Sequence, residues 1–437
     1  MILDEAQARQ LIEKTLSFAS ADEVRVNLGG GRQHNTRFAV NSITTCGDAD
    51  GLSVAVTAYF GKRHATASAS EIDDAALRRV VATAQEMARV APEDPEYVPE
   101  LGPQEYLPIR PYFESTAKAT AELGVEVARS AIEPAARDGL TAAGFFEHGH
   151  GFDAVGNNKG LSGYHQSSAA AYSVTARTLA GGGSGWAADN SRDIDEVDFA
   201  AASRRAIEKA EASRNPKTLE PGVYPAILEP QAVADFIVHA VWSMNARSAD
   251  EGRSFYARPG GGNKIGEKVA ADAVTILTDP ARPEILAGPF GGDGFPARRN
   301  VWIEGGVVRQ LFYDRYWAQK QGKEPTGRPC NLIIEGGEAS LGDLIRSTDR
   351  AILITRFWYI RSLDPQTLLV TGLTRDGLFW VEGGEIRHSI KNFRFNESPI
   401  AVLGKVTGLT RPVRVGDALV PALRTSAFTF SSLSEAV

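Results

Sequence analysis

The sequence predicts an α+β protein. A two-layer N-terminal α/β domain of antiparallel sheets and helices should precede a mostly antiparallel, barrel-like C-terminal β domain. In the first half, apolar residues recur at helical spacing in some segments and alternate in others, as in amphipathic helices and half-buried strands. In the second half, Gly-Gly pairs separate alternating apolar runs, which is typical of tight hairpins. A length of 437 residues suits two domains better than one core.

Each element of the first half follows from its local pattern. Helices are expected where apolar side chains recur every three or four residues, at 5–18, 72–90, near 114–136 and at 192–213. Strands are expected where apolar and polar residues alternate, at 23–28, at 52–60 and within 142–188. Glycine-rich segments are expected to be turns, at 29–31, 156–160 and 181–185.

A polar stretch with two prolines, residues 213–222, is the predicted domain boundary. It divides the chain into an N-terminal α+β domain, 1–215, and a C-terminal β-rich domain, 216–437. In the second domain, helices are expected at 230–247, near 315–321 and near 340–346. Two segments, 302–309 and 380–387, share an apolar run followed by Gly-Gly and are expected to form hairpins. The segment 333–337 repeats part of the same pattern.

Composition and charge argue against several classes of function. The formal net charge is −7 and charges of both signs are interspersed, so no basic face or tail indicates nucleic-acid binding. No apolar run approaches the roughly 20 residues of a membrane span, and the N-terminus lacks the pattern of a secretory signal. Two cysteines, Cys46 and Cys330, are too few for a disulfide framework. We therefore expect a cytoplasmic protein that binds neither nucleic acid nor membrane.

The helix predicted at 230–247 carries the most informative residues. His239 is followed by Ala240 and, five positions on, by Met244, with no carboxylate between them. A hydrolytic zinc ion normally has three protein ligands, an open water position and a nearby Glu. His239 could supply one ligand, and it is otherwise expected to hydrogen-bond Asp235 or solvent. The sequence thus predicts no catalytic residue and no metal site on this helix.

Two further groups leave alternatives open. His148, His150 and His165 could be read as a metal cluster, although polar residues beside a turn are the simpler interpretation. Arg375 and Asp376 lie at a predicted turn between two strongly β segments. They form either an ion pair of that turn or part of a loop that faces a substrate.

A long, ordered set of motifs in this chain resembles the TldD/PmbA family. The N-terminal half carries two of these motifs, at 51–56 and 61–65. The rest follow one another through the second half, at 251–255, 264–269, 278–280, 288–296, 303–307, 311–314, 326–327, 331–337, 371–372 and 381–386. The resemblance thus covers most of the chain.

The resemblance implies which subunit type this chain is similar to. TldD-type members carry a His-Glu-x-x-x-His motif on a helix and a Cys near the C-terminus. Here His239 matches the first His, Ala240 replaces Glu and Met244 replaces the second His, while 411–421 contains no Cys. The chain therefore resembles the PmbA/TldE type, the non-catalytic partner of a TldD-like catalytic subunit.

That type implies a heterodimer that encloses a chamber in which unfolded or small peptides are cleaved, with zinc only in the TldD-type subunit. His239, Arg375 and Asp376 are then candidate peptide-binding residues. A peptide can add as a strand to a sheet edge, which gives affinity without much sequence preference. Two alternatives stay open: a stand-alone metallopeptidase with non-standard ligands, and a homodimeric peptide-binding regulator.

Overall fold

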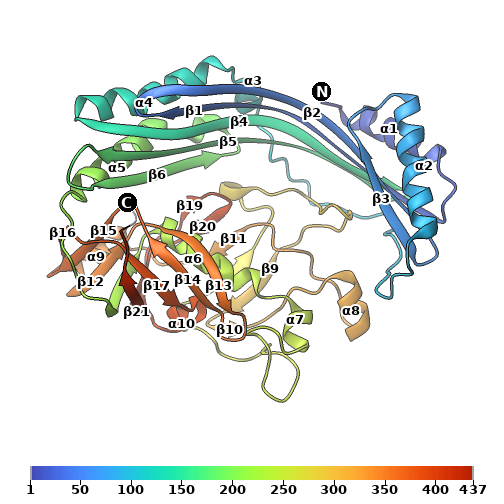
Figure 1. Cartoon of the computed structure of the whole chain (residues 1–437). Helices are drawn as coiled ribbons and strands as arrows, with labels where there is room; N and C mark the ends of the chain where they lie inside the picture. Colours follow the sequence, from blue (N-terminus) through green and yellow to red (C-terminus); the bar gives the residue numbers. More distant parts are fainter. Residues whose placement is uncertain (1, 436–437) are drawn as a thin grey trace.

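The computed structural model of the chain describes residues 2–435. Figure 1 shows a long curved sheet that arches over a more compact, β-rich half of the molecule. The six strands of this sheet are all antiparallel and lie in the order β3-β2-β1-β4-β5-β6. Their bounds are β1 Glu23–Ala39, β2 Ser42–Phe60, β3 Arg63–Ala69, β4 Leu140–Asn157, β5 Ser162–Thr178 and β6 Ser184–Ser191. We call this sheet and its helices the arch.

Five helices belong to the arch, and the four longest cover one face of its sheet. Val26 and Val56 pack against helices near the N-terminal end, whereas Phe38, on the same face of β1, packs in a second core. Burial of each such side chain stabilises the fold by roughly 1.5–3 kcal/mol. The helices are α1 Glu5–Ser17, α2 Asp74–Val90, α3 Glu114–Lys118, α4 Glu122–Arg137 and α5 Phe199–Ala212.

Two of the long helices expected in the arch are shorter than the sequence predicts. The helix expected near 114–136 is broken into α3 and α4. The helix expected at 192–213 begins only at Phe199, after a 3-10 turn over Ile194–Glu196. The Asp198 side chain caps this start by accepting a hydrogen bond from the Ala201 N–H, 2.8 Å. Capping chemistry, rather than apolar spacing, sets this boundary.

The turn predicted at 29–31 is wrong, because β1 runs straight through these three glycines. A Cβ at Gly31 would lie 2.8 Å from the His150 carbonyl oxygen. Glycine inside a strand often marks such a close backbone approach. The turn that ends β1 is formed instead by Val40 and Asn41, whose φ angles are 50° and 58°.

The β-rich lower half contains two open sheets. One has nine strands, with the path β13-β14-β17-β21-β7-β12-β15-β16 and β18 paired to β21. Its strands are β7 Gly222–Leu228, β12 Arg350–Ile354, β13 Phe357–Asp364, β14 Leu369–Thr374, β15 Leu378–Glu382, β16 Glu385–Ser389, β17 Phe393–Glu397, β18 Val406–Leu409 and β21 Leu423–Leu433. The α+β class and the mostly antiparallel pairing are confirmed, but within the described residues neither sheet closes into a barrel.

The second sheet has six short strands in the order β10-β9-β8-β11-β20-β19. They are β8 Ile276–Thr278, β9 Asn300–Glu304, β10 Val307–Val308, β11 Leu332–Ile334, β19 Val413–Val415 and β20 Ala418–Val420. The lower half also contains α6 Pro230–Trp242, α7 Ala246–Asp250, α8 Arg315–Gln321, α9 Leu341–Arg346, α10 Pro399–Gly404 and a 3-10 turn at Pro283–Ile285.

Two of the three Gly-Gly segments form hairpins. Gly305 and Gly306 connect β9 to β10, and Gly383 and Gly384 connect β15 to β16, all with positive φ. The segment 333–337 has the same sequence pattern but forms no hairpin, because β11 pairs with β8 and β20 and the chain then leads into α9. A Gly-Gly pair after an apolar run is therefore not sufficient for a hairpin.

Candidate functional site

Helix α6 lies at the centre of the lower half and contacts strands of both lower sheets. Its buried face includes Phe236 and Ala240, which belong to the largest apolar core. Pro230 occupies its first turn, where the missing N–H has no intrahelical partner to lose. This packing fixes the direction of the remaining, partly exposed side chains, among them His239.

His239 is half-buried near the C-terminal end of α6. Its ring meets the exposed Trp242 ring edge-on, with 5.3 Å between centroids. Burial lowers the pKa of His239, which favours the neutral imidazole. The carboxylate of Asp235 is not its partner, because it accepts hydrogen bonds from Gln231 Nε2 at 2.7 Å and from the Phe357 N–H at 3.0 Å.

The two other positions of the degenerate motif are buried in the core. Ala240 is fully buried and its carbonyl accepts a hydrogen bond from the Tyr256 hydroxyl, 3.1 Å. Met244 is also buried, but the predicted helix 230–247 ends at Trp242, so Met244 lies outside it. Beyond the helix, the Met244 carbonyl accepts a hydrogen bond from the Phe312 N–H, 2.7 Å.

Among residues 2–435, no group of three or more His, Cys, Asp or Glu side chains is arranged to hold a metal ion. The alternative ligands do not converge. His148 and His150 lie on one face of β4, and His148 stacks on His34 with 4.9 Å between ring centroids. His165 is paired across the strands with Asp153, an odd-numbered position whose side chain lies on the opposite face of the sheet.

Asp376 forms a buried joint between the lower half and the arch. One carboxylate oxygen accepts a hydrogen bond from the Ser184 hydroxyl on β6, 2.6 Å. The other oxygen lies 3.6 Å from Arg356 and 3.7 Å from Arg375. The Asp376 side chain is only 3% exposed. A carboxylate in this position holds two layers together and has little surface left for a ligand.

The two arginines beside Asp376 each lie over an indole ring. The Arg356 guanidinium is 3.9 Å from the centroid of Trp186, and that of Arg375 is 4.2 Å from Trp358. Burial lowers the pKa of Arg356, partly offset by the negative charges of Asp235 and Asp376. The Arg356 guanidinium thus interacts electrostatically with Asp235 on α6 and with Asp376 in the turn between β14 and β15.

The structure brings Arg375 and Asp376 together and links them through Arg356 to the helix that carries His239. Sequence reasoning did not single out Arg356, although a charged residue two positions after the buried strand β12 was a usable signal. No sequence pattern indicated Trp186, which comes from a strand of the other half.

Comparisons with known proteins place this geometry in a family. The PmbA/TldA metallopeptidase domain 1 matches residues 25–88, the central domain matches 114–214 and the C-terminal domain matches 221–432. Together they cover most of the chain. The fold and the helix α6 thus define a metallopeptidase-like α+β protein.

Curated relatives agree with this class. The chain is 23% identical over 458 residues to metalloprotease PmbA of Escherichia coli O157:H7, covering 97% of this chain and 96% of that protein. It is 26% identical over 255 residues to a metalloprotease of Methanothermobacter thermautotrophicus, where the match spans 54% of this chain and about half, 52%, of that relative. A zinc metalloprotease TldD homolog of Saccharolobus solfataricus is 24% identical over 50% of each chain. The chain belongs to the PmbA/TldD family.

Solved structures show the same fold. TldE from Thermococcus kodakarensis superposes with a TM-score of 0.87 at 20% identity, covering 97% of this chain and 99% of that one. A Thermotoga maritima protein described as a candidate modulator of a DNA gyrase gives a TM-score of 0.87 at 22% identity, covering 97% and 100%. In the described residues, no helix is long and apolar enough to cross a membrane.

Proposed function

We propose that this chain is a zinc-free, non-catalytic subunit of the TldE/PmbA type, which forms a peptide-binding chamber together with a TldD-type zinc metallopeptidase. One observation carries the proposal. At the positions where a His-Glu-x-x-x-His motif would place its Glu and second His, the chain has Ala240 and Met244, and both are buried in the core. Neither an aliphatic nor a buried thioether side chain can replace a general base or a zinc-binding imidazole.

The lower half offers a surface suited to extended peptides. β13 is the terminal strand of the nine-stranded sheet, so one of its edges has no neighbouring strand in that sheet. It carries the exposed rings of Trp358 and Tyr359, and Arg361 lies over the latter at 4.2 Å. Main-chain hydrogen bonds to such an edge bind a peptide with little regard for its sequence. Aromatic rings and guanidinium groups beside the edge would add affinity.

Hydrogen bonds between the arch and the lower half support a peptide-binding chamber of fixed shape. Arg414 on β19 donates hydrogen bonds to the Ser191 hydroxyl at 3.0 Å and to Glu196 at 2.7 Å. At another point Arg247 binds both carboxylate oxygens of Glu96, at 2.6 and 2.8 Å. A rigid frame suits a subunit that shapes a chamber rather than one that performs the reaction. The proposal places the complex in the cytoplasm, where the free thiols Cys46 and Cys330 stay reduced.

Reconstitution tests this proposal. The chain would be purified alone, and also co-expressed with the TldD-type subunit of its own organism. We expect the lone chain to leave an unfolded peptide intact, and we expect a 1:1 complex that cleaves it in a chelator-sensitive manner. A complex whose TldD-type subunit has its motif Glu replaced by Gln is the matched control and should be inactive. Chelator-sensitive cleavage by the lone chain, or no complex between the two subunits, would contradict the proposal.

A further inference from the structure

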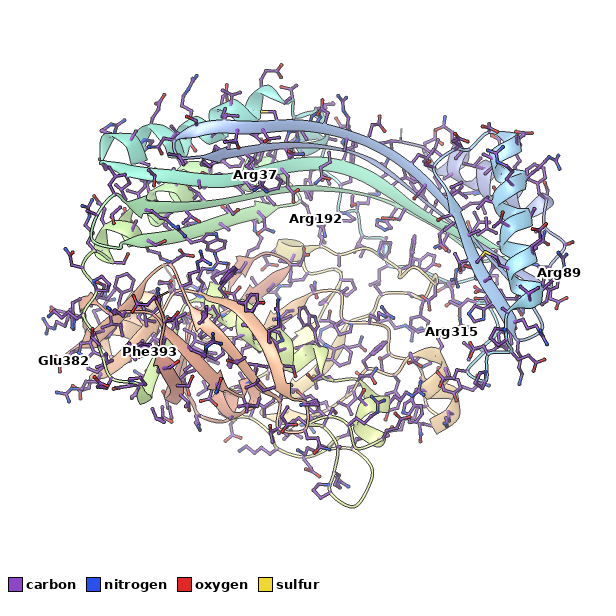
Figure 2. The ribbon with its side chains drawn as sticks, viewed as in Figure 1. Arg37, Arg89, Arg192, Arg315, Glu382 and Phe393 are labelled. Atoms are coloured by element: carbon purple, nitrogen blue, oxygen red, sulfur yellow. The ribbon has the colours of Figure 1, made fainter. Side chains whose placement is uncertain are left out.

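A pocket of about 490 Å³ lies where the arch meets the lower half. It is bounded by Arg192 from the arch and by three segments of the lower half, 287–297, 312–315 and 325–330. Figure 2 shows Arg192 beneath the curved sheet and Arg315 on the lower half, on opposite sides of this region. The size is within the range of sites for small ligands or for one to a few peptide residues.

The positive charge in this pocket exceeds the negative charge. Arg192, Arg315 and Arg328 line it, against the carboxylates of Asp293 and Asp314. Each carboxylate is already used by the backbone: Asp293 accepts from the Phe295 N–H at 3.1 Å, and Asp314 accepts from the Trp317 N–H at 2.7 Å. Among the described residues, neither carboxylate forms an ion pair with these arginines.

The arginines are held mainly by neutral groups. Arg192 Nε donates to the Leu286 carbonyl at 3.2 Å, and its nearest carboxylate is that of the exposed Asp417, 3.6 Å away. Arg315 donates to the Pro99 carbonyl. Among the residues that the structure describes, neither Arg315 nor the exposed Arg328 has an ion-pair partner. Guanidinium groups placed in this way are suited to bind a carboxylate.

The rest of the pocket wall is apolar and fixed in place. Phe290 packs edge-on against His165 of β5, with 5.1 Å between ring centroids, and lies 4.9 Å from Tyr106. The same Tyr106 donates its hydroxyl hydrogen to the Gly294 carbonyl, 2.8 Å. The segment that carries Phe290 and Phe295 is thus attached to the arch. An apolar side chain can enter this pocket without prior rearrangement of that wall.

One wall of the pocket is hydrogen-bonded to the chain just beyond helix α6. Phe312, in its wall, donates its N–H to the Met244 carbonyl just beyond that helix. This hydrogen bond fixes one wall of the pocket relative to helix α6. An internal apolar residue of a peptide has no charged group, whereas a C-terminal apolar residue has both its side chain and a free carboxylate.

We propose that this pocket binds the C-terminal residue of an extended peptide, with the free carboxylate at Arg328 and an apolar side chain against the phenylalanines. This inference rests on the proposed function, because it assumes that the chain meets peptides. It also gives the bound peptide a direction, with its C-terminus at the junction of the arch and the lower half.

Fluorescence anisotropy on the purified full chain tests the inference. The probe is a fluorescein-labelled hexapeptide that ends in phenylalanine, prepared with a free C-terminal carboxylate and as the C-terminal amide. A charge-assisted contact predicts that the free acid binds about tenfold more tightly than the amide. Arg328→Gln should reduce this ratio to about one, because Arg328 is exposed and has no structural ion pair. Arg309→Gln, at an exposed arginine paired with Glu304, is the matched control and should keep the ratio.

A second variant separates apolar binding from charge. Ala297→Phe places a large ring in the pocket wall and should weaken binding of the free acid at least about tenfold, with the fold checked by circular dichroism. Equal affinity for acid and amide, an unchanged ratio in Arg328→Gln, or no binding of either peptide would overturn the inference. Failure of the proposed function has a different signature, namely hydrolysis by the lone chain.

Discussion

Replacing Asp376 with alanine is expected to lower the free energy of unfolding by about 3 kcal/mol. The change removes the acceptor of the Ser184 hydroxyl and leaves the guanidinium of Arg356 without its nearest carboxylate. It also puts alanine at a φ of 55°, a left-handed conformation that aspartate tolerates better. Urea denaturation of the full chain measures the loss.

Two comparison variants make this result specific. Asp376→Asn retains an acceptor for Ser184 and a residue suited to positive φ, so its loss should be smaller than that of Asp376→Ala. Asp272→Ala removes a carboxylate that is 86% exposed and should change the stability little. If Asp376→Ala were as mild as Asp272→Ala, Asp376 would not be the joint between the two halves, and a role facing the substrate would regain support.

Gly149→Ala in β4 is expected to destabilise the chain by about 1–3 kcal/mol. The new Cβ would lie 2.3 Å from the Arg32 carbonyl oxygen on β1, a backbone atom that cannot move without displacing the strand. The cost therefore arises from overpacking between two paired strands. Thermal or urea unfolding followed by circular dichroism measures it.

Gly51→Ala provides the matched control in the same sheet. Gly51 lies inside β2, and a Cβ there would meet no atom within 4 Å. Alanine restricts the unfolded chain more than glycine does, so the stability should be unchanged or higher by about 0.5 kcal/mol. Equal effects of the two variants would show that close strand approach is not the reason for glycine at position 149.

The secondary structure was largely predictable from the sequence where local chemistry determines it. The amphipathic helices α1 and α2 and the Gly-Gly hairpins follow from spacing and from positive φ at glycine. The glycines at 29–31 misled the prediction because the role of Gly31 depends on a strand more than 100 residues later, whose His150 carbonyl leaves no room for a side chain at that position. Long-range packing of this kind has no local sequence signal.

The candidate site was likewise predictable from the sequence only where local residues determine it. The loss of the metal motif at Ala240 and Met244 can be read directly from the sequence. The link from Asp376 to the arch could not be predicted, because its partner Ser184 lies 192 positions earlier. Likewise, the apolar periodicity within 230–247 does not reveal that α6 ends at Trp242.

The zinc content of the lone, fully folded chain tests the central claim most directly. Elemental analysis after dialysis against a low concentration of zinc should find far less than one ion per chain, and His239→Ala should leave that content unchanged. Retention of one zinc ion per chain, lost on His239→Ala, would contradict the account. It would mean that side chains elsewhere in the molecule complete a metal site around this single imidazole.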